Sequence, residues 1–316
     1  MDLSVVIPAY NQREQLTALL DSLTGFEENI ESIVVNGPST DGTSGMLRAR
    51  DDVDCVLETA SRNINVARNA GLREAQSDRI ALISPTFEIS DTWVTAIVES
   101  LRGENDVVSG PIVPDRVGED KRRVVDDDTH LQINGENVAF TRSAITALDG
   151  FDEFLVIDGA VDLSQRVHQQ GLQLVWHPDM RVFDRHADID EPIHNGSLDP
   201  ASWQEHANPG WGVIYRSRAY LQTKNNGIGP RVLSTIIKSA LVDGAIAARE
   251  VARGNASPTS WIGNGVAVVQ NVVIGIKKGR EARNADRTPA RNPHGMSQSD
   301  DTNIVDRYDR RETTLS

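Results

Sequence analysis

The sequence predicts an α/β fold in which helices cover both faces of a mostly parallel sheet, followed by a C-terminal helical region. Short apolar runs rich in β-branched residues alternate with segments whose leucines recur at helical spacing. The apolar runs are almost continuous, as is typical of strands buried on both faces. The length of 316 residues provides enough chain for one large domain or two smaller ones. Strand–helix alternation of this kind favours a doubly covered parallel sheet.

The first part of the chain provides the clearest elements. The predicted strands are Leu3–Ile7, which ends at Pro8, then Ile30–Val35, Val53–Glu58 and Arg79–Ile83. The predicted helices between them are Gln12–Leu23, a helix that begins near Thr43, and Asn65–Ala75. Consecutive strands joined through helices lie parallel in one sheet.

The alternation becomes less regular after residue 100. The predicted strands there are Val107–Val113, Ala139–Thr141 and Leu172–Trp176, and the predicted helices are Ser143–Leu148, Val161–Gln170, Trp211–Lys224 and Gly229–Arg253. Charged residues crowd the segment 115–128, and residues 187–210 contain several Pro, Asn and Asp, so we expect loops at both places.

These patterns divide the chain into three regions. Residues 1–210 form the α/β domain, residues 211–281 form the helical region, and the polar residues 282–316 are expected to be a disordered tail. Gly263–Ile276 is apolar but interrupted by polar residues and is followed by a basic cluster. It therefore fits a helix lying in a membrane interface as well as one packed on the main domain.

The sequence shows no signal for export or for membrane insertion. Met1 leads directly into an apolar strand without a basic segment before it. No apolar stretch reaches the roughly 18 to 20 residues that span a bilayer. We expect the protein to stay inside the cell, either free in the cytoplasm or resting on the cytoplasmic side of the membrane.

Composition limits the partners and the covalent chemistry. The chain has 46 acidic and 32 basic residues, for a net charge of −14, which argues against nucleic acid as a partner. The basic residues comprise 27 Arg and only 5 Lys. This balance suggests a high-salt cytoplasm, and compositional drift in a GC-rich genome is the alternative. Cys55 is the single cysteine, which excludes an intramolecular disulfide and a cysteine-based zinc site.

Polar residues gather where three of the predicted strands end. Ligands of open parallel sheets bind at the carboxyl ends of the strands. Backbone groups, an aromatic ring and a helix N-terminus at this edge suit a nucleotide. The run from Ser39 to Thr43 is also a good helix N-cap, which remains the structural alternative. The candidate donor-binding residues here are Pro8, Ala9, Tyr10, Asn11, Asn36, Thr40, Asp41, Ser84 and Thr86.

Five segments stand out along residues 2–190: SVVIPAYNQREQLTALLDSL, IVVNGPSTDGT, SRNINVARNAGLREAQSDRIALIS, NGENVAFTRSAITALDGFDE and VDLSQRVHQQGLQLVWHP. In this order they resemble the motifs of family 2 glycosyltransferases, which have the GT-A fold. Residues 215–225 (YRSRAYLQTKN) resemble a segment of members that extend lipid-linked or surface glycans. Together with the acidic composition, the resemblance points to haloarchaeal members of surface-glycoprotein N-glycosylation.

The resemblance implies a nucleotide-sugar donor, a lipid-linked saccharide or surface-glycan acceptor, and other glycosylation enzymes as partners. It also implies one inverting displacement, helped by a general base and in most members by Mg²⁺ or Mn²⁺. Arg68 and Asn69 match the family motif directly and join the candidate donor-binding residues.

The sequence departs from the family pattern at three acidic positions. The Asp-x-Asp metal motif corresponds to Ser84-Pro85-Thr86, the aspartate after the second strand to Asn36, and the Glu-Asp pair that supplies the base to Gly159-Ala160. No metal ligand is therefore assigned.

Other residues are candidates for the missing roles. We expect Asp158 to replace the base beside the surviving Asp162, and Arg142 and His186 to bind acceptor or phosphate. Arg62 and Arg68 offer further cationic groups for the diphosphate. Each candidate also fits a plain structural role in a turn, a surface ion pair or a helix.

Two functions remain open. The first is an enzyme that transfers sugar to the glycan acceptor. The second is a degenerate member that has lost catalysis and serves as a binding or scaffold partner of an active glycosyltransferase. Turnover of a sugar nucleotide distinguishes the two.

Overall fold

The computed structural model describes residues 1–114, 133, 135–184, 211–253, 258–285 and 292–311. The chain divides into two compact units, which are described separately. Unit 1 comprises Met1–Phe154, Gly159–Leu198 and His294–Ser316, and unit 2 comprises Leu155–Asp158 and Asp199–Pro293.

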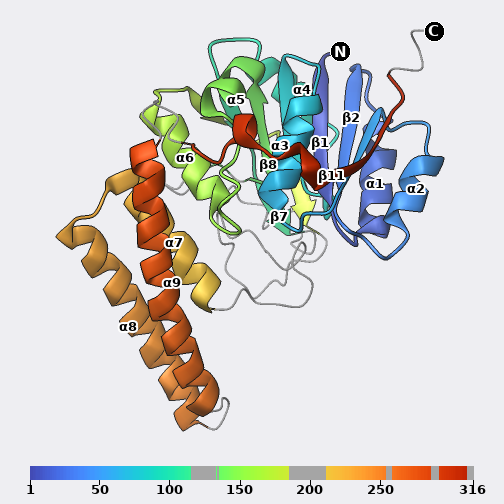
Figure 1. Ribbon diagram of the computed structural model, residues 1–316. Coiled ribbons are helices and arrows are strands. Elements are labelled where there is room, and N and C mark those ends of the chain that lie inside the picture. Colours follow the sequence, from blue (N-terminus) through green and yellow to red (C-terminus); the bar gives the residue numbers. More distant parts are fainter. Residues whose placement is uncertain (115–132, 134, 185–210, 254–257, 286–291, 312–316) are drawn as a thin grey trace. The chain divides into compact units, whose positions relative to one another are not determined.

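An eight-stranded sheet forms the centre of unit 1 (Figure 1). Its strands, in sheet order, are β11 (Ile304–Asp309), β3 (Cys55–Thr59), β2 (Ile30–Asn36), β1 (Leu3–Ala9), β4 (Arg79–Ile83), β8 (Asn137–Thr141), β6 (Val107–Ser109) and β9 (Leu174–Trp176). Strands β3, β2, β1 and β4 run parallel, whereas β8 and β11 are antiparallel to their neighbours. The predicted α/β class with a mostly parallel sheet is confirmed.

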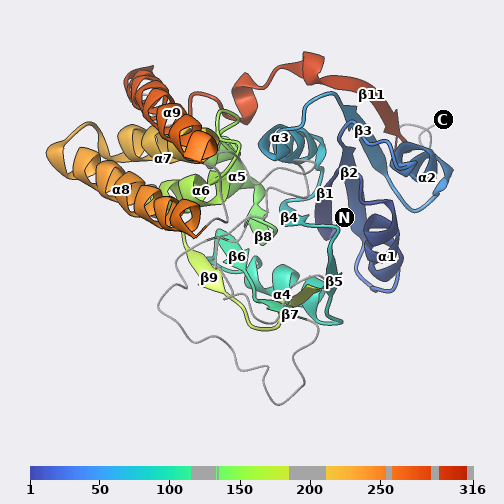
Figure 2. The same cartoon turned by 90° about the horizontal axis from the view of Figure 1, so that it is seen from below.

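Helices cover both faces of this sheet (Figure 2). Unit 1 contains α1 (Arg13–Leu23), α2 (Thr43–Ala49), α3 (Ile64–Glu74), α4 (Trp93–Ser100), α5 (Arg142–Leu148) and α6 (Gly159–Gln169). A second sheet of three short strands, in the order β5 (Phe87–Ile89), β10 (Val182–Asp184) and β7 (Ile112–Pro114), lies beside α4.

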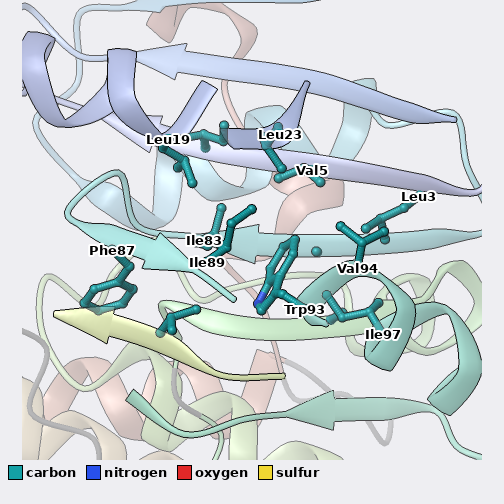
Figure 3. Close-up of a cluster of buried hydrophobic side chains, with 14 of the residues drawn as sticks. Leu3, Val5, Leu19, Leu23, Ile83, Phe87, Ile89, Trp93, Val94 and Ile97 are labelled. Carbon is teal, nitrogen blue, oxygen red and sulfur yellow. The ribbon is translucent and has the colours of Figure 1, made fainter. Parts of the chain in front are cut away.

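The alternation of side chains along β1 sends one set to each face. Val5 belongs to a buried cluster with Leu19 of α1 and Trp93 of α4 (Figure 3). Val6 points to the opposite face, where α3 approaches so closely that a Cβ on Gly71 would lie 2.3 Å from Val6 Cγ1. A strand buried on both faces requires the continuous apolar run that the sequence shows.

Most predicted strands differ from the structure by one or two residues, and two of the differences have a clear physical reason. β1 continues through Pro8, which pairs with Val35, because the ladder to β4 stops at Val6 and no N–H is needed beyond it. The predicted strand Val107–Val113 is divided into β6 and β7. A Cβ on Gly110 would lie 2.0 Å from the Met180 carbonyl oxygen, so the break lies at a close backbone approach that only glycine permits.

The C-terminal segment differs from the disordered tail expected over 282–316. Strand β11 pairs antiparallel with β3 and covers the edge of the sheet. Arg311 contacts the buried Glu31 and also donates to the Glu74 carbonyl oxygen at 3.0 Å. A polar segment of this kind is ordered by its partners on the sheet, which local sequence does not reveal.

Unit 2 consists of the predicted C-terminal helices, α7 (Trp211–Asn226), α8 (Pro230–Ala252) and α9 (Pro258–Ala285). Helices α7 and α9 pack closely, because Cβ atoms on Gly275 and Gly279 would lie 2.4 and 2.6 Å from carbonyl oxygens of α7. Among the described helices, none combines the length and hydropathy needed to cross a membrane.

Candidate functional site

The carboxyl ends of β1, β2 and β3 meet at one edge of the sheet. Ala9 pairs with Asn36, and Asn36 pairs with Glu58, so these three residues stand in one row across the edge. Side chains in such a row share a face of the sheet. The sequence therefore brings a polar cluster to the place where ligands of open α/β sheets bind.

The loops after β1 and β2 are joined by hydrogen bonds. The Asn11 N–H donates to Ser39 Oγ at 2.9 Å, and the Thr40 N–H donates to Asn11 Oδ1 at 2.8 Å. Asn11 adopts the left-handed conformation with φ of 52°, which asparagine tolerates better than most residues. The predicted residues Asn11 and Thr40 are thus brought together with Pro8 and Ala9 at the end of β1.

Asp41 connects the start of α1 with the start of α2. Its carboxylate accepts from the Arg13 N–H at 2.9 Å and from Thr43 Oγ1 at 2.6 Å. Burial raises the pKa of Asp41, but the hydrogen bonds from Thr43 and Arg13 outweigh it, so its pKa lies below the ordinary value. Helix α2 begins after Gly42, which makes no side-chain cap hydrogen bond, so these contacts of Asp41 fix the loop geometry of the edge and do not form the predicted N-cap.

Asn36 is completely buried, and neighbours occupy both of its amide hydrogens. Its Nδ2 donates to Ser44 Oγ at 2.9 Å and to Glu58 Oε2 at 2.8 Å, while its Oδ1 accepts from Ser39 Oγ at 2.7 Å. Asn36 is therefore a framework residue that orients Ser39 and Glu58.

Glu58 is a functional candidate that sequence reasoning missed. Its Oε2 accepts from Asn36, whereas its Oε1 is buried and has no hydrogen-bond partner among the described residues. A buried carboxylate oxygen without a donor is costly and calls for a partner. The signal in the sequence was a single acidic residue near the end of an apolar strand.

Tyr10 lies at the same edge, but its ring is almost fully buried. The exposed Arg62, which follows β3, places its guanidinium carbon 5.7 Å from the centre of the Tyr10 ring. The aromatic group predicted for this edge is therefore present together with a cation.

The end of β4 presents hydroxyl groups. Ser84 Oγ and Thr86 Oγ1 lie 2.9 Å apart and hydrogen-bond to each other. Mg²⁺ and Mn²⁺ prefer carboxylate oxygens, and residues 84–86 contain none. Ser84, Pro85 and Thr86 therefore do not fit the divalent metal that the family resemblance implies.

One cluster of possible metal ligands occurs among the described residues, and it lies elsewhere. Cys55, Glu74 and Asp309 bring their ligand atoms within 4.8 Å of one another at the amino end of β3. Arg311 and Arg307 already pair with both carboxylates. Burial raises the pKa of the Cys55 thiol to about 12, which disfavours the thiolate that a metal requires. We assign no metal to it.

Arg68 and Asn69 hold the loop before α6. Asn69 exchanges two hydrogen bonds with the backbone of Phe151, at 2.9 and 2.8 Å. The buried Arg68 lies 4.9 Å from the centre of the Phe151 ring and donates to Asn65 Oδ1 at 3.1 Å. Burial lowers the pKa of Arg68 to about 10, and its Nε has no partner among the described residues. The motif segment that contains Arg68 and Asn69 is thus packed against the segment that contains Phe151.

The contacts of Asp162 indicate a structural role. It is fully buried and accepts from Arg166 Nε at 2.7 Å, one turn along α6. Arg166 also donates to the carbonyl oxygens of Leu148 and Gly150 at 2.6 and 2.9 Å. This ion pair joins α6 to the end of α5.

Asp158 precedes α6 and belongs to unit 2. Its backbone is left-handed, with φ of 62°, which is uncommon for a residue with a side chain. Burial raises the pKa of Asp158, and the charge of Arg218 on α7 partly opposes this. The carboxyl group is therefore set to hold a proton at higher pH than an ordinary aspartate.

The structure does not bring Arg142 to the candidate site. Its guanidinium donates to the carbonyl oxygens of Ala75 and Ser77 at 2.7 and 2.5 Å, and its N–H donates to Asp78. These residues precede β4, so Arg142 lies at the amino edge of the sheet, opposite the strand ends that form the site. His186 lies outside the described residues.

The comparison with protein families decides the class of the protein. A family model for glycosyl transferase family 2 matches residues 4–172, which is more than half of the chain. The chain belongs to glycosyltransferase family 2. The resemblance seen in the five sequence segments is thereby confirmed.

Curated relatives are distant and only partly covered. The glycosyltransferase AglE of Haloferax volcanii is 25% identical over 198 residues, which are 56% of this chain and 64% of AglE. The dolichol-phosphate mannosyltransferase of Pyrococcus furiosus is 25% identical over 115 residues, 35% of this chain and 33% of the relative. This chain thus spans less than two thirds of the length of either relative.

Two solved structures share the fold. Mannosyltransferase PcManGT from Pyrobaculum calidifontis, in complex with GDP-Man and Mn²⁺, has a TM-score of 0.52 and 17% identity over 88% of this chain and 86% of its own. TarS of S. aureus, residues 1–349 with UDP-GlcNAc, has a TM-score of 0.56 and 15% identity over 92% of this chain and 88% of its own. Both support the GT-A fold.

Proposed function

We propose that this protein transfers a sugar from a nucleotide-sugar donor to a hydroxyl of a lipid-linked saccharide or surface glycan, in protein N-glycosylation or polysaccharide assembly at the cytoplasmic side of the membrane. The observation that carries the proposal is the family match over residues 4–172, the part of the chain that contains the polar edge of the sheet. The sugar nucleotides named in the two neighbouring structures and the relative AglE support it.

The donor occupies the edge formed by β1, β2 and β3 in this proposal. The joined loops of Asn11 and Thr40 give it a rigid wall, and the half-buried Glu58 turns its Oε1, which protein atoms cover in the structure, to accept from a nucleobase N–H. Uracil, thymine and guanine present a ring N–H, whereas cytosine and adenine present an amino group beside a ring nitrogen that is itself an acceptor and is repelled by a carboxylate. The donor is therefore a uridine, thymidine or guanosine diphosphate sugar.

Charge on the leaving diphosphate is balanced by protein cations. Since Ser84 and Thr86 do not fit a divalent metal, we derive no step through one. Arg62 is an exposed guanidinium at this edge, and arginine binds phosphate through two hydrogen bonds. Arg68 contacts the ring of Phe151 and so supports the loop before α6.

Asp158 is the proposed general base. The acceptor hydroxyl oxygen bonds to the anomeric carbon, and its proton passes to the Asp158 carboxylate. The bond from that carbon to the diphosphate oxygen breaks, and the nucleoside diphosphate leaves with the electron pair. One displacement inverts the configuration at the sugar. A pKa raised by burial suits this role, because a base works best when its pKa is near the operating pH.

Calorimetric titration with UDP-, GDP- and dTDP-sugars, with and without Mn²⁺ and at low and high salt, tests the proposal. We expect one donor to bind without metal, and hydrolysis or transfer of its sugar to follow. Failure of every donor to bind to folded protein would refute the donor site. Mn²⁺-dependent binding would refute the metal-free site.

A scaffold role is the second candidate. The absence of carboxylates at Ser84-Pro85-Thr86 favours it, because cation-assisted departure of the diphosphate is the usual requirement of this chemistry. A donor that binds but is never turned over, with any acceptor, is the result that this candidate expects.

A further inference from the structure

Helices α8 and α9 of unit 2 expose apolar side chains along their length. On α8, Leu233, Ile237 and Leu241 recur every four residues, and on α9, Val266, Val269 and Val273 recur every three or four. Such spacing places each set on one side of its helix. Leu241 is 68% exposed and Val269 is 65% exposed, so neither helix hides its set against a neighbour.

The two apolar sets belong to consecutive helices of unit 2, which form a hairpin. Helix α8 runs to Ala252 and α9 begins at Pro258, and the two helices approach each other toward these connected ends (Figure 1). Both helices of the hairpin therefore contribute exposed apolar side chains.

Positive charge is concentrated in the same helical region. Residues 211–285 contain eleven Arg and Lys and only three Asp and Glu, in a chain whose net charge is −14. Four of the five lysines of the whole chain are here. On α9, Lys277 and Arg280 continue the spacing of Val266, Val269 and Val273 and are exposed. The apolar set is therefore followed by cations on the same side of the helix.

We infer that the hairpin of α8 and α9 docks on an anionic membrane surface. Apolar side chains enter the boundary between headgroups and acyl chains, and long Lys and Arg side chains reach the lipid phosphates. Pairing of this hairpin with the hairpin of a second copy fits less well, because both would present the same positive charge. The inference deepens the membrane location in the proposed function, and its test uses neither donor nor acceptor. A failure here is therefore distinguishable from a failure of sugar transfer.

Flotation of the full-length protein with vesicles tests the inference. The vesicles are either phosphatidylglycerol or phosphatidylcholine, in 0.15 M or 3 M KCl. We expect binding to phosphatidylglycerol that weakens in high salt, because salt screens the attraction between lysine and lipid. Lys277→Glu should weaken it several-fold at low salt only. No binding to either vesicle, or equal binding to both, would overturn the inference.

Matched variants separate the hairpin from the rest of the surface. Val269→Glu should lower the vesicle partition coefficient roughly tenfold, because a charged group replaces an apolar side chain that docking buries in the membrane. Val305→Glu, at a 64% exposed valine of β11, is the control and should bind within about twofold of the wild type. Circular dichroism checks that both variants are folded. Equal losses of vesicle binding in the two variants would contradict membrane docking. So would a wild-type protein that does not bind vesicles but self-associates in a way that Val269→Glu abolishes and Val305→Glu does not.

Discussion

At the scale of single residues, the network of Asn36 and Glu58 gives a test of the donor. Glu58 Oε1 is a buried acceptor without a hydrogen-bond partner in the described part of the chain, and Asn36 donates to the other carboxylate oxygen. Glu58→Gln keeps the shape but removes the charge. A charge-assisted hydrogen bond is worth roughly 1.5–3 kcal/mol, so UDP or GDP should bind about tenfold more weakly or worse. CDP and ADP should bind as well or better, since the Gln amide N–H can donate to the ring nitrogen of cytosine or adenine.

Competition titration of the four nucleoside diphosphates measures this change. The exposed Glu99→Gln variant is the control for the loss of one negative charge and should leave every affinity unchanged. If Glu58→Gln weakens all four nucleotides equally, Glu58 supports the fold of the edge and does not select the base.

Asp158 gives the second prediction at this scale. Asp158→Asn should lower the transfer rate by roughly two to four orders of magnitude while donor affinity stays the same, because the amide cannot accept the proton. In the wild type only the ionised carboxylate is active. Because burial raises its pKa, the rate should rise with pH through a value above that of an ordinary aspartate and fall on acidification.

The rate constant measured as a function of pH checks both parts. The acid limb should disappear in Asp158→Asn. A variant that keeps the full rate, or a limb that persists in it, would assign the base to another group.

The positions of Asn11, Asn36 and Thr40 could be predicted because chain order fixes them. They lie at or just after the ends of parallel strands, so the topology brings them to one edge, and their donor-binding role stays a prediction. Arg142 was misplaced because a motif match does not say at which end of an antiparallel strand a side chain lies. Glu58 was missed because its importance rests on an atom left without a partner, which is a property of packing.

At the scale of elements, apolar periodicity predicted many of the helices and strands to within a few residues, but it did not predict α4, β5, β10 or β11. Strand β11 has little apolar character and pairs with a strand that lies about 250 residues away in sequence. Its order depends on ion pairs and backbone hydrogen bonds to the edge of the sheet, such as Arg310 to the Val53 carbonyl oxygen at 2.7 Å. The local sequence therefore does not predict that this segment pairs with the edge of the sheet.

The attachment of β11 can be tested at Arg311. Arg311→Ala leaves the carboxylate of Glu31 buried without its cation, which typically costs about 3–5 kcal/mol. Arg48→Ala removes the exposed pair with Asp306 and should cost less than about 1 kcal/mol. Urea unfolding compares the two free energies. Similar values for both variants would show that the buried pair does not anchor the strand.

At the scale of the whole molecule, the distribution of charge separates two kinds of surface. Outside residues 211–285 the chain has 43 acidic and 21 basic residues, whereas the helical region is basic. Acidic groups that repel one another destabilise the compact state, and dissolved ions shorten the range of that repulsion. The same acidic charges lower the stability of the folded state at low salt and keep protein molecules from associating with one another. Stability and membrane docking should therefore respond to salt in opposite directions.

We expect the free energy of unfolding to rise when KCl is increased from 0.15 M to 1 M, because the Debye length falls from about 8 Å to about 3 Å. A gain of about 1 kcal/mol would raise the Tm by roughly 2–4 °C in a domain of this size. The exposed Glu99 and Glu104 allow a control: replacing both with Gln should raise the Tm at low salt and reduce its dependence on KCl. Thermal unfolding followed by circular dichroism measures all four conditions. If the double variant gains as much from KCl as the wild type, the stabilisation does not arise from screening of acidic repulsion, because that repulsion is what the substitutions remove.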